Sequence, residues 1–298
     1  MRRRHAMTSS GPVLRTRQVA GISELVECLR HISSDVVMHF TPEGLQICEL
    51  TATNALYIAV LLQIDRFESY QGTGSVRVGC LPLHGALKAI TRQVARQGGT
   101  GHDGMLEMRV GVHSLSLSLT CVDNTGDSPD MLYELPAEVL DPAVADEMVA
   151  SAAARRELLM RPENFGSIMY MNARHLTHLV SHVLPLGDVV KVACCGNRVD
   201  FAVINRHSDI TSVRVSFREA LGSGGRAAGD AGHSMDGHCS VFRQPLFTML
   251  LRAMSQHTTS TLLLPRAPRN PAMMQASVSD LGSMSIAIAQ IDDPGGSP

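Results

Sequence analysis

The stretches that decide the fold are "DVVMHFTPEGLQICEL" at 35–50 and "DVVKVACCGNRVDFAV" at 188–203. Each begins with Asp-Val-Val directly after a helical pattern, reaches a glycine, and continues into a second strand-like run. The glycine follows nine residues after Asp35 in the first stretch and eight residues after Asp188 in the second. The same local pattern therefore occurs twice, about half the chain apart, which indicates an internal duplication.

Helical periodicity occurs twice in each half of the chain, among many strand-like runs. These helical patterns cover 22–32, 82–96, 172–183 and 244–256. The repeated order of elements predicts an α+β fold of two similar domains with two helices each. The expected division is a tail at 1–12, a first domain at 13–135, a connector at 136–164 with a helix at about 143–160, a second domain at 165–293 and a tail at 294–298. A low-complexity loop is expected at 219–237.

The bulk composition excludes several classes of protein. Formal net charge is −2, so a strongly basic nucleic-acid-binding chain is excluded and any basic surface must be local. The longest apolar run, 55–62, has eight residues and is too short to span a bilayer, so we expect no membrane partner. The seven cysteines form no C-x-x-C pair, which indicates buried thiols in a reducing compartment.

Charge is unevenly distributed between helices and strands. The helical stretches contain seven cations, with Arg243 at an edge, and two acids, Glu24 and Glu27, which gives 7 − 2 = +5 on a chain of net charge −2. The other six cations are Arg30, Lys88, Arg92, Arg96, Arg174 and Arg252. A positive helical face with few aromatic residues (4%, no Trp) favours salt-sensitive contact with duplex phosphates and argues against base stacking.

Three histidines, His175, His178 and His182, lie on one face of the predicted helix at 172–183. They allow two interpretations: a metal site, or partly protonated side chains that face DNA. The chain has no G-x-S-x-G, P-loop or H-E-x-x-H motif, and no nucleophile is paired with a base. We therefore expect no enzymatic activity and no cofactor.

Four strings, in order, resemble the PCNA-type DNA sliding clamps. They are "LVECLRHI" (25–32), "GLQICELTATNALYIAVLLQIDRFESY" (44–70), "LGDVVKVACCGNRVDFAV" (186–203) and "AMMQASVSDLGSMSIAIAQIDD" (272–293), the last with an Asp-x-Gly turn at Asp280 and Gly282. The resemblance implies two similar domains of antiparallel sheets, with the helices lining the hole of a ring. It also implies a processivity factor that encircles duplex DNA without sequence specificity and tethers polymerase.

Site residues follow from this resemblance. Arg30, Lys88, His178 and Arg252 match inner-surface cations of the family, and Arg92, Arg96 and Arg174 lie close by on the same helices. Two departures, Glu24 where the family tends to have lysine and His178 in place of a permanent cation, make this surface less positive than usual.

The resemblance also implies a hydrophobic pocket between the C-terminal strand and the connector, in which partner proteins bind through short peptide motifs. The matching positions are Leu50, Ala55, Tyr57, Pro271, Ile288, Ala289 and Ile291. The proline common after the position of Ala289 is absent, and the connector is longer than typical, which indicates a divergent clamp such as a viral or protist one.

The expected partners are double-stranded DNA, DNA polymerase, other replication and repair proteins, and a clamp loader, and the expected location is the nucleus. The resemblance implies a homotrimer closed through edge strands, for which the candidates are 130–136 and 210–217. Two alternatives stay open: a checkpoint-type subunit of a hetero-oligomeric clamp, and a metal-dependent enzyme that uses His175, His178 and His182.

Overall fold

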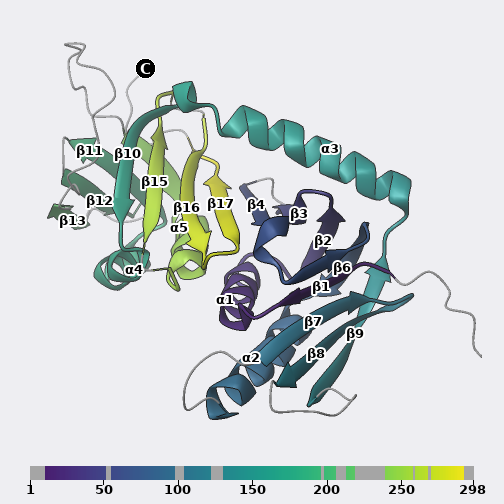
Figure 1. The fold of residues 1–298 in the computed structure, drawn as a ribbon. Coiled ribbons are helices and arrows are strands. Elements are labelled where there is room, and N and C mark those ends of the chain that lie inside the picture. Colours follow the sequence, from purple (N-terminus) through teal and green to yellow (C-terminus); the bar gives the residue numbers. More distant parts are fainter. Residues whose placement is uncertain are drawn as a thin grey trace, which may run out of the picture. The chain divides into compact units, whose positions relative to one another are not determined.

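The structure is a computed structural model of the chain, shown in Figure 1. It describes residues 11–51, 55–97, 104–121, 130–195, 198–205, 213–218, 239–257, 259–267 and 270–291. The chain divides into two compact units. Unit 1 contains the described residues of 11–49, 59–153 and 278–283, and unit 2 contains those of 50–58, 154–277 and 284–291. The tails at 1–10 and 294–298 and the expected loop at 219–237 lie outside the described residues.

Unit 1 contains one antiparallel sheet, the helices α1 and α2, and residues 142–153 of the connecting helix. Its strands pair in the order β3-β2-β6-β9-β8-β7-β1-β5. The elements are β1 (Val13–Thr16), α1 (Val19–Leu29), β2 (Asp35–Thr41), β3 (Gly44–Leu50), β5 (Ser69–Gln71), β6 (Gly74–Gly79), α2 (Cys80–Gln97), β7 (Gly104–Val110), β8 (Ser114–Cys121) and β9 (Met131–Val139). A short 3-10 helix (Ile64–Arg66) precedes β5, and β4 (Leu56–Gln63) contributes residues to both units.

Strand β9 joins the two halves of this sheet. Its residues 131–136 pair with β8, and its residues 137–139 pair with β6. One strand thus changes partner along its length, which makes the sheet of unit 1 continuous.

Unit 2 repeats the same elements. They are β10 (Phe165–Met171), α4 (Ala173–Ser181), β11 (Val189–Cys195), β12 (Arg198–Ile204), β13 (Val213–Arg218), β14 (Cys239–Arg243), α5 (Gln244–Met254), β15 (Ser260–Pro265), β16 (Ala272–Val278) and β17 (Gly282–Ile288), the last shared between the units. The strands pair antiparallel as β13-β12-β11-β14 and as β10-β15-β16. The backbone N–H of Ile291 donates to the carbonyl of Val241 on β14 at 2.9 Å.

The two units confirm the predicted fold class. In unit 1 the order β2-β3, α2, β7-β8-β9 follows β1 and α1, and in unit 2 the order β11-β12, α5, β15-β16-β17 follows β10 and α4. Helix α3 (Pro142–Leu159) separates the two copies along the chain. None of the described helices is long and apolar enough to cross a membrane.

The first helix lies three residues earlier than the predicted 22–32. It starts at Val19, after the hydroxyl of Thr16 accepts the N–H of Gln18 at 3.0 Å. After Leu29 the amides of His31 and Ile32 bond three residues back, to Cys28 and Leu29, so the last predicted turn is a tight 3-10 type turn.

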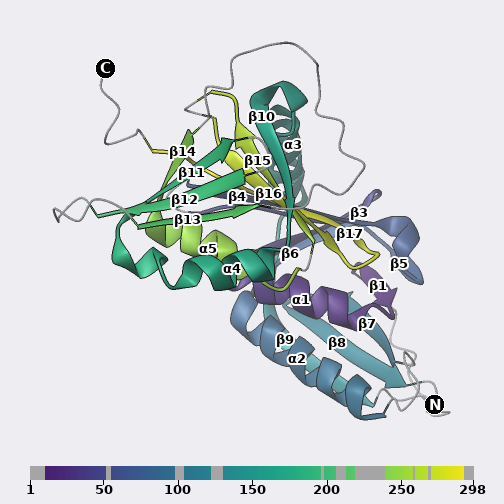
Figure 2. The same cartoon turned by 90° about the vertical axis from the view of Figure 1, so that its left-hand side faces the viewer.

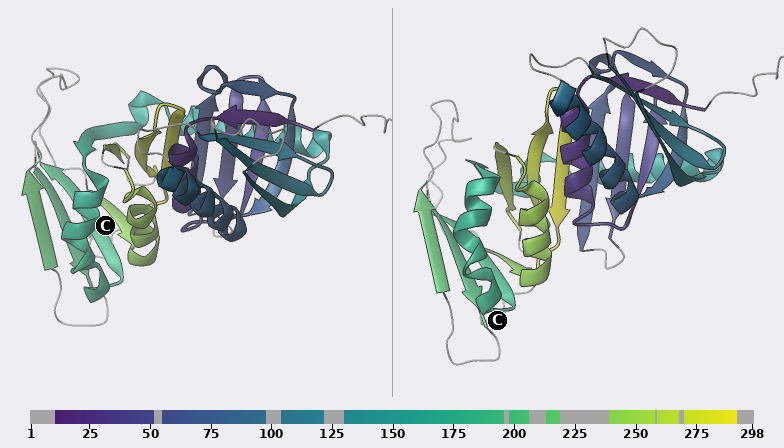
Figure 3. Two further views of the ribbon diagram at one scale, coloured as in Figure 1. Left: turned by 60° about the horizontal axis from the view of Figure 1, so that its bottom comes forward. Right: turned by 90° about the horizontal axis from the view of Figure 1, so that it is seen from below.

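Helices α1 and α2 cover one face of the sheet of unit 1, as Figure 3 shows. Leu115, Leu117 and Leu119 of β8 are fully buried. A side chain at Gly104 would meet Val94 of α2 and Leu119 together, so the leucine face of β8 is the one that packs against α2. The alternating serines of β8 therefore lie on the opposite face.

Two glycines allow the chain to pass close to β4 in unit 1. Gly44 has φ +136°, and a Cβ there would lie 1.9 Å from the carbonyl oxygen of Leu62. A Cβ on Gly282 would lie 2.0 Å from the carbonyl oxygen of Leu61. Any side chain at these positions would displace the backbone, so both positions require glycine.

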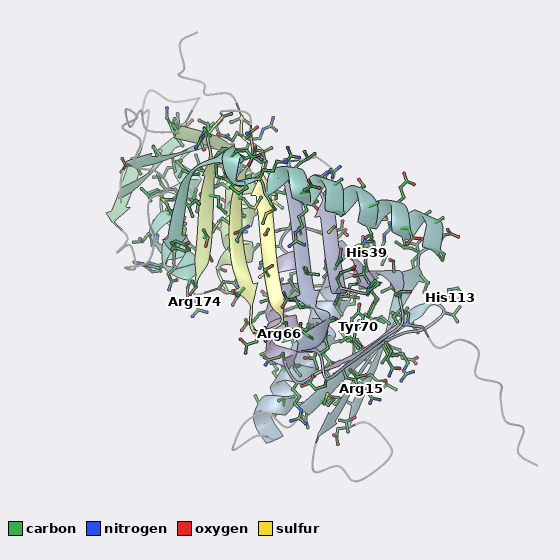
Figure 4. All side chains as sticks on the ribbon, turned by 45° about the horizontal axis from the view of Figure 1, so that its top comes forward. Arg15, His39, Arg66, Tyr70, His113 and Arg174 are labelled. Carbon is green, nitrogen blue, oxygen red and sulfur yellow. The ribbon has the colours of Figure 1, made fainter. Side chains whose placement is uncertain are left out.

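His39 on β2, labelled in Figure 4, is a buried imidazole in unit 1. Its Nδ1 lies 2.8 Å from the hydroxyl of Ser75. Within the described part of the chain, its Nε2 has no hydrogen-bond partner. Burial lowers the pKa of His39, because the charged ring would lose its water.

We expect His39 to make unit 1 sensitive to acid. Its contribution to the free energy of unfolding is full above the unfolded pKa of about 6.5 and is lost as pH falls toward the lowered folded pKa, by at most about 1.4 kcal/mol per pH unit. Denaturant unfolding between pH 5 and 8 should therefore show a smaller pH dependence for His39→Gln than for the wild type. Exposed His113→Gln is the control, and an equal change in both variants would contradict the assignment.

Candidate nucleic-acid and partner-binding surfaces

Helix α2 presents a row of free cations in unit 1. Lys88, Arg92 and Arg96 are exposed and lie four residues apart, on one face of the helix. None of the ion pairs of the described residues involves them. Because α2 contains no acidic residue, this row is positive along its whole length.

Arg30, the fourth predicted cation of unit 1, has an acidic partner. It follows α1 and donates from Nε to the Oε2 of Glu27 at 2.8 Å and from Nη2 to Oε1. The same carboxylate contacts Nε2 of His84 on α2 and lies 3.5 Å from Nε2 of His31. The Arg30 hydrogen bond, opposed by burial and assisted by His84, holds the pKa of Glu27 at about 2.

In unit 2 the predicted cations lie on the two packed helices. Figure 2 shows α4 and α5 side by side on one face of the strands. Thr177 on α4 donates to the carbonyl of Leu251 on α5 at 3.2 Å, and Nε of Arg174 lies 3.5 Å from the carbonyl of Ser255. Arg174, labelled in Figure 4, His178 and Arg252 are all exposed, and neither helix contains an acid.

His175 and His178 on α4 and His182 at its C-terminus are exposed. The rings of His178 and His182 meet edge to face with centroids 5.8 Å apart. No group of three or more His, Cys, Asp or Glu side chains that could hold a metal ion occurs in the part of the chain that the structure describes. Among the described residues, His175, His178 and His182 therefore do not form a metal-binding site, and the alternative of a metal-dependent enzyme gains no support from them.

The seven predicted pocket residues all belong to unit 2. Tyr57 and Ile288 are buried, whereas Leu50, Ala55, Pro271, Ala289 and Ile291 are half-buried. The amide of Ala289 donates to the carbonyl of Ala55 at 2.8 Å, which joins the end of β17 to the start of β4. The structure thus brings two of the seven residues, Ala55 and Ala289, together.

Gln290 follows Ala289, at the position where the proline common in PCNA-type clamps is absent. Its side chain forms hydrogen bonds beside the apolar patch. Its side-chain nitrogen donates to the carbonyl of Asn270 at 2.5 Å, beside Pro271. Its side-chain oxygen accepts from the amide of Val241 at 3.3 Å. The amide side chain therefore makes contacts that proline could not make.

Arg155 is a residue of this surface that the sequence did not reveal. It lies on α3, and its guanidinium carbon is 5.6 Å from the centre of the Tyr57 ring, a cation–π distance. The sequence shows two neighbouring arginines in the connector, Arg155 and Arg156, but helical periodicity alone does not predict which of them contacts Tyr57. The connector is therefore a helix that places a cation over the apolar patch.

Strands β9 and β13 are among those with a free edge in the described part of the chain. Residues 131–136 of β9 pair with β8 on one side only, and β13 ends its sheet, with β12 as its neighbour. These strands overlap the segments predicted as edge strands, 130–136 and 210–217, of which 210–212 lie outside the described residues. Their unpaired backbone groups can accept another strand.

Comparison with solved structures confirms the predicted clamp fold. The chain is similar to the proliferating cellular nuclear antigen (PCNA) of Entamoeba histolytica, with a TM-score of 0.67 and 12% identity over 95% of this chain and 100% of that one. It is also similar to a chain of the PCNA2–PCNA3 complex of Sulfolobus tokodaii, with a TM-score of 0.64 and 13% identity over 94% of this chain and 100% of that one. No protein-family model and no curated protein matches its sequence.

The fold is thus that of the DNA sliding clamps. More particularly, it is the two-domain fold of a PCNA subunit, present over nearly the whole chain. At this level of identity the comparison establishes the fold, and the roles of individual residues must be argued from their chemistry.

Proposed function

We propose that the chain is the subunit of a sliding clamp, a non-enzymatic processivity factor that encircles duplex DNA and tethers DNA polymerase and other replication and repair proteins. The observation that carries this proposal is the set of exposed cations on α2, α4 and α5, three helices without a single acid, on a PCNA fold. Such helices attract phosphates and read no bases.

The partner-binding role rests on the apolar patch of unit 2. Half-buried apolar side chains beside a buried tyrosine suit a short helical turn with apolar and aromatic anchors. DNA polymerase and other clamp-binding proteins would use such motifs here. A clamp loader and a nuclear location belong to the same proposal.

Ring closure would join the free edge of β9 in one subunit to β13 in the next, and we propose a homotrimer. A hetero-oligomeric, checkpoint-type clamp is a second candidate, because one similar structure is a complex of two different PCNA subunits. Light scattering at micromolar concentration separates the two candidates. A trimer supports the first, and a lone monomer that assembles only with other clamp subunits supports the second.

Removing the cations of α2 should weaken the clamp on DNA. We expect the Lys88→Ala/Arg92→Ala/Arg96→Ala variant to lose polymerase extension on primed circular DNA at lower salt than the wild type. Its binding to a short linear duplex should show a salt slope reduced by about 0.9 for each phosphate that the variant no longer neutralises.

The matched control is Arg66→Ala/Arg77→Ala/Arg161→Ala, which removes the same charge from arginines that are paired with acids outside α2. This control should keep the wild-type salt response. If the α2 variant also kept it, the DNA-binding proposal would be wrong.

Truncating the half-buried pocket residues should weaken partner binding. We expect Leu50→Ala/Ile291→Ala to bind the clamp-interacting peptide of the cognate polymerase roughly tenfold more weakly, because each truncation removes apolar surface that the peptide would cover. Fluorescence anisotropy of the labelled peptide measures this change in affinity. Leu186→Ala, an exposed leucine elsewhere in unit 2, is the control. Unchanged peptide affinity in the double variant would refute the pocket assignment.

A further inference from the structure

A cluster of four ionisable side chains lies where α1 meets α2 in unit 1. Glu27 is at its centre, with Arg30 and His31 from the end of α1 and His84 from α2 around it. The side chains of Glu27 and His84 retain only 20% and 11% of their exposure, whereas Arg30 keeps 31%. The side chain of Glu27 is therefore partly buried, and that of Arg30 is somewhat more exposed.

We propose that Glu27 is an electrostatic brake on DNA binding, which keeps Arg30 paired and thereby removes one cation from the helical face of unit 1. The proposal rests on the proposed function, because it concerns how tightly the same face holds DNA. It goes beyond that function by assigning an opposing role to an acidic residue on this face.

Geometry makes the carboxylate a direct competitor of phosphate. Glu27 engages Arg30 through both of its oxygens, with Nε donating to one and Nη2 to the other. A phosphate group would compete for the same Nε and Nη2 donors, so Arg30 cannot offer this side of its guanidinium to both partners at once. The pair is also partly shielded from water, so salt screens it less than it screens an exposed pair.

His84 holds the carboxylate in place for this competition. Its Nε2 contacts the Oε2 of Glu27 from the neighbouring helix, while His31 approaches Oε1 from the end of α1. Arg30 lowers the pKa of Glu27 to about 2, so the carboxylate is charged throughout the range in which the protein works. Burial lowers the pKa of His84, which favours a neutral ring beside the ion pair.

The remaining charged neighbours define what the brake acts upon. Lys88 follows His84 by one turn of α2 and helps to lower the pKa of His84, after burial. Glu24 lies one turn before Glu27 and is exposed. Of the four cations predicted to contact DNA in unit 1, Arg30 is paired with Glu27, whereas Lys88, Arg92 and Arg96 on α2 are in none of the ion pairs of the described residues.

The test measures binding of the full chain to a short linear duplex by anisotropy at several salt concentrations. We expect Glu27→Gln to bind about fivefold more tightly at low salt and to have a salt slope steeper by about one, because Arg30 becomes free to bind a phosphate. In the wild type, Arg30→Ala should leave the slope unchanged. In the Glu27→Gln background, it should restore the wild-type slope.

Glu24→Gln is the matched control, because it removes the same charge from the same helix without releasing Arg30. Equal affinities for the two glutamine variants, or no detectable binding by either, would overturn the brake. If the Lys88/Arg92/Arg96 variant loses DNA binding while the two glutamine variants bind DNA with equal affinity, the brake is wrong and the proposed function stands. If that triple variant binds DNA as the wild type does, the proposed function is wrong. Unfolding curves identify a variant that fails to fold, in which case Glu27→Asp, whose shorter carboxylate reaches Arg30 less well, must show the same direction of change.

Discussion

Strand β9 sets the architecture of unit 1, because it is hydrogen-bonded to β8 through residues 131–136 and to β6 through residues 137–139. This change of partner makes one sheet out of strands that lie far apart in the sequence, and the sheet supports α1 and α2 on its leucine face. In unit 2 the amide of Ile291, beyond β17, makes the corresponding bond to β14. In unit 1 the sheet that contains the free edge of β9 also supports α1 and α2, so the proposed assembly and the proposed DNA contact would depend on one arrangement.

Within this arrangement, the placement of acids decides which helical cations are available. Lys88, Arg92 and Arg96 stand on a helix without acids and are exposed, whereas Arg30 ends a helix whose Glu27 is one turn away. A resemblance to a family predicts which positions of this chain carry cations, but it does not predict which acidic side chains pair with those cations. Arg30 shows the difference, because its charge is present but its Nε and Nη2 donors are already bound to Glu27.

Much of the fold could be predicted from the sequence, since the recurrence of Asp-Val-Val at 35 and 188 and the four helical patterns reveal the duplication. The ends of the helices are predicted less accurately, because the tight turn after Leu29 depends on backbone hydrogen bonds that the hydrophobic periodicity does not reveal. The Glu27–His84 contact and the stacking of Arg155 on Tyr57 join separate elements, so no local pattern could reveal them. The apolar patch was predicted by resemblance, but its Gln290 rim was found only in the structure.

We propose that the cationic helices, and not the serine face of the sheet of unit 1, meet duplex DNA. Site-specific photocrosslinking in unit 1 tests this most directly, with a photoreactive amino acid placed at Arg92 on α2 or at Ser116 on β8, loaded onto circular duplex of arbitrary sequence. We expect crosslinks from position 92 on every DNA sequence and none from position 116. Equal crosslinking from both positions, or crosslinking from position 116 alone, would contradict the claim.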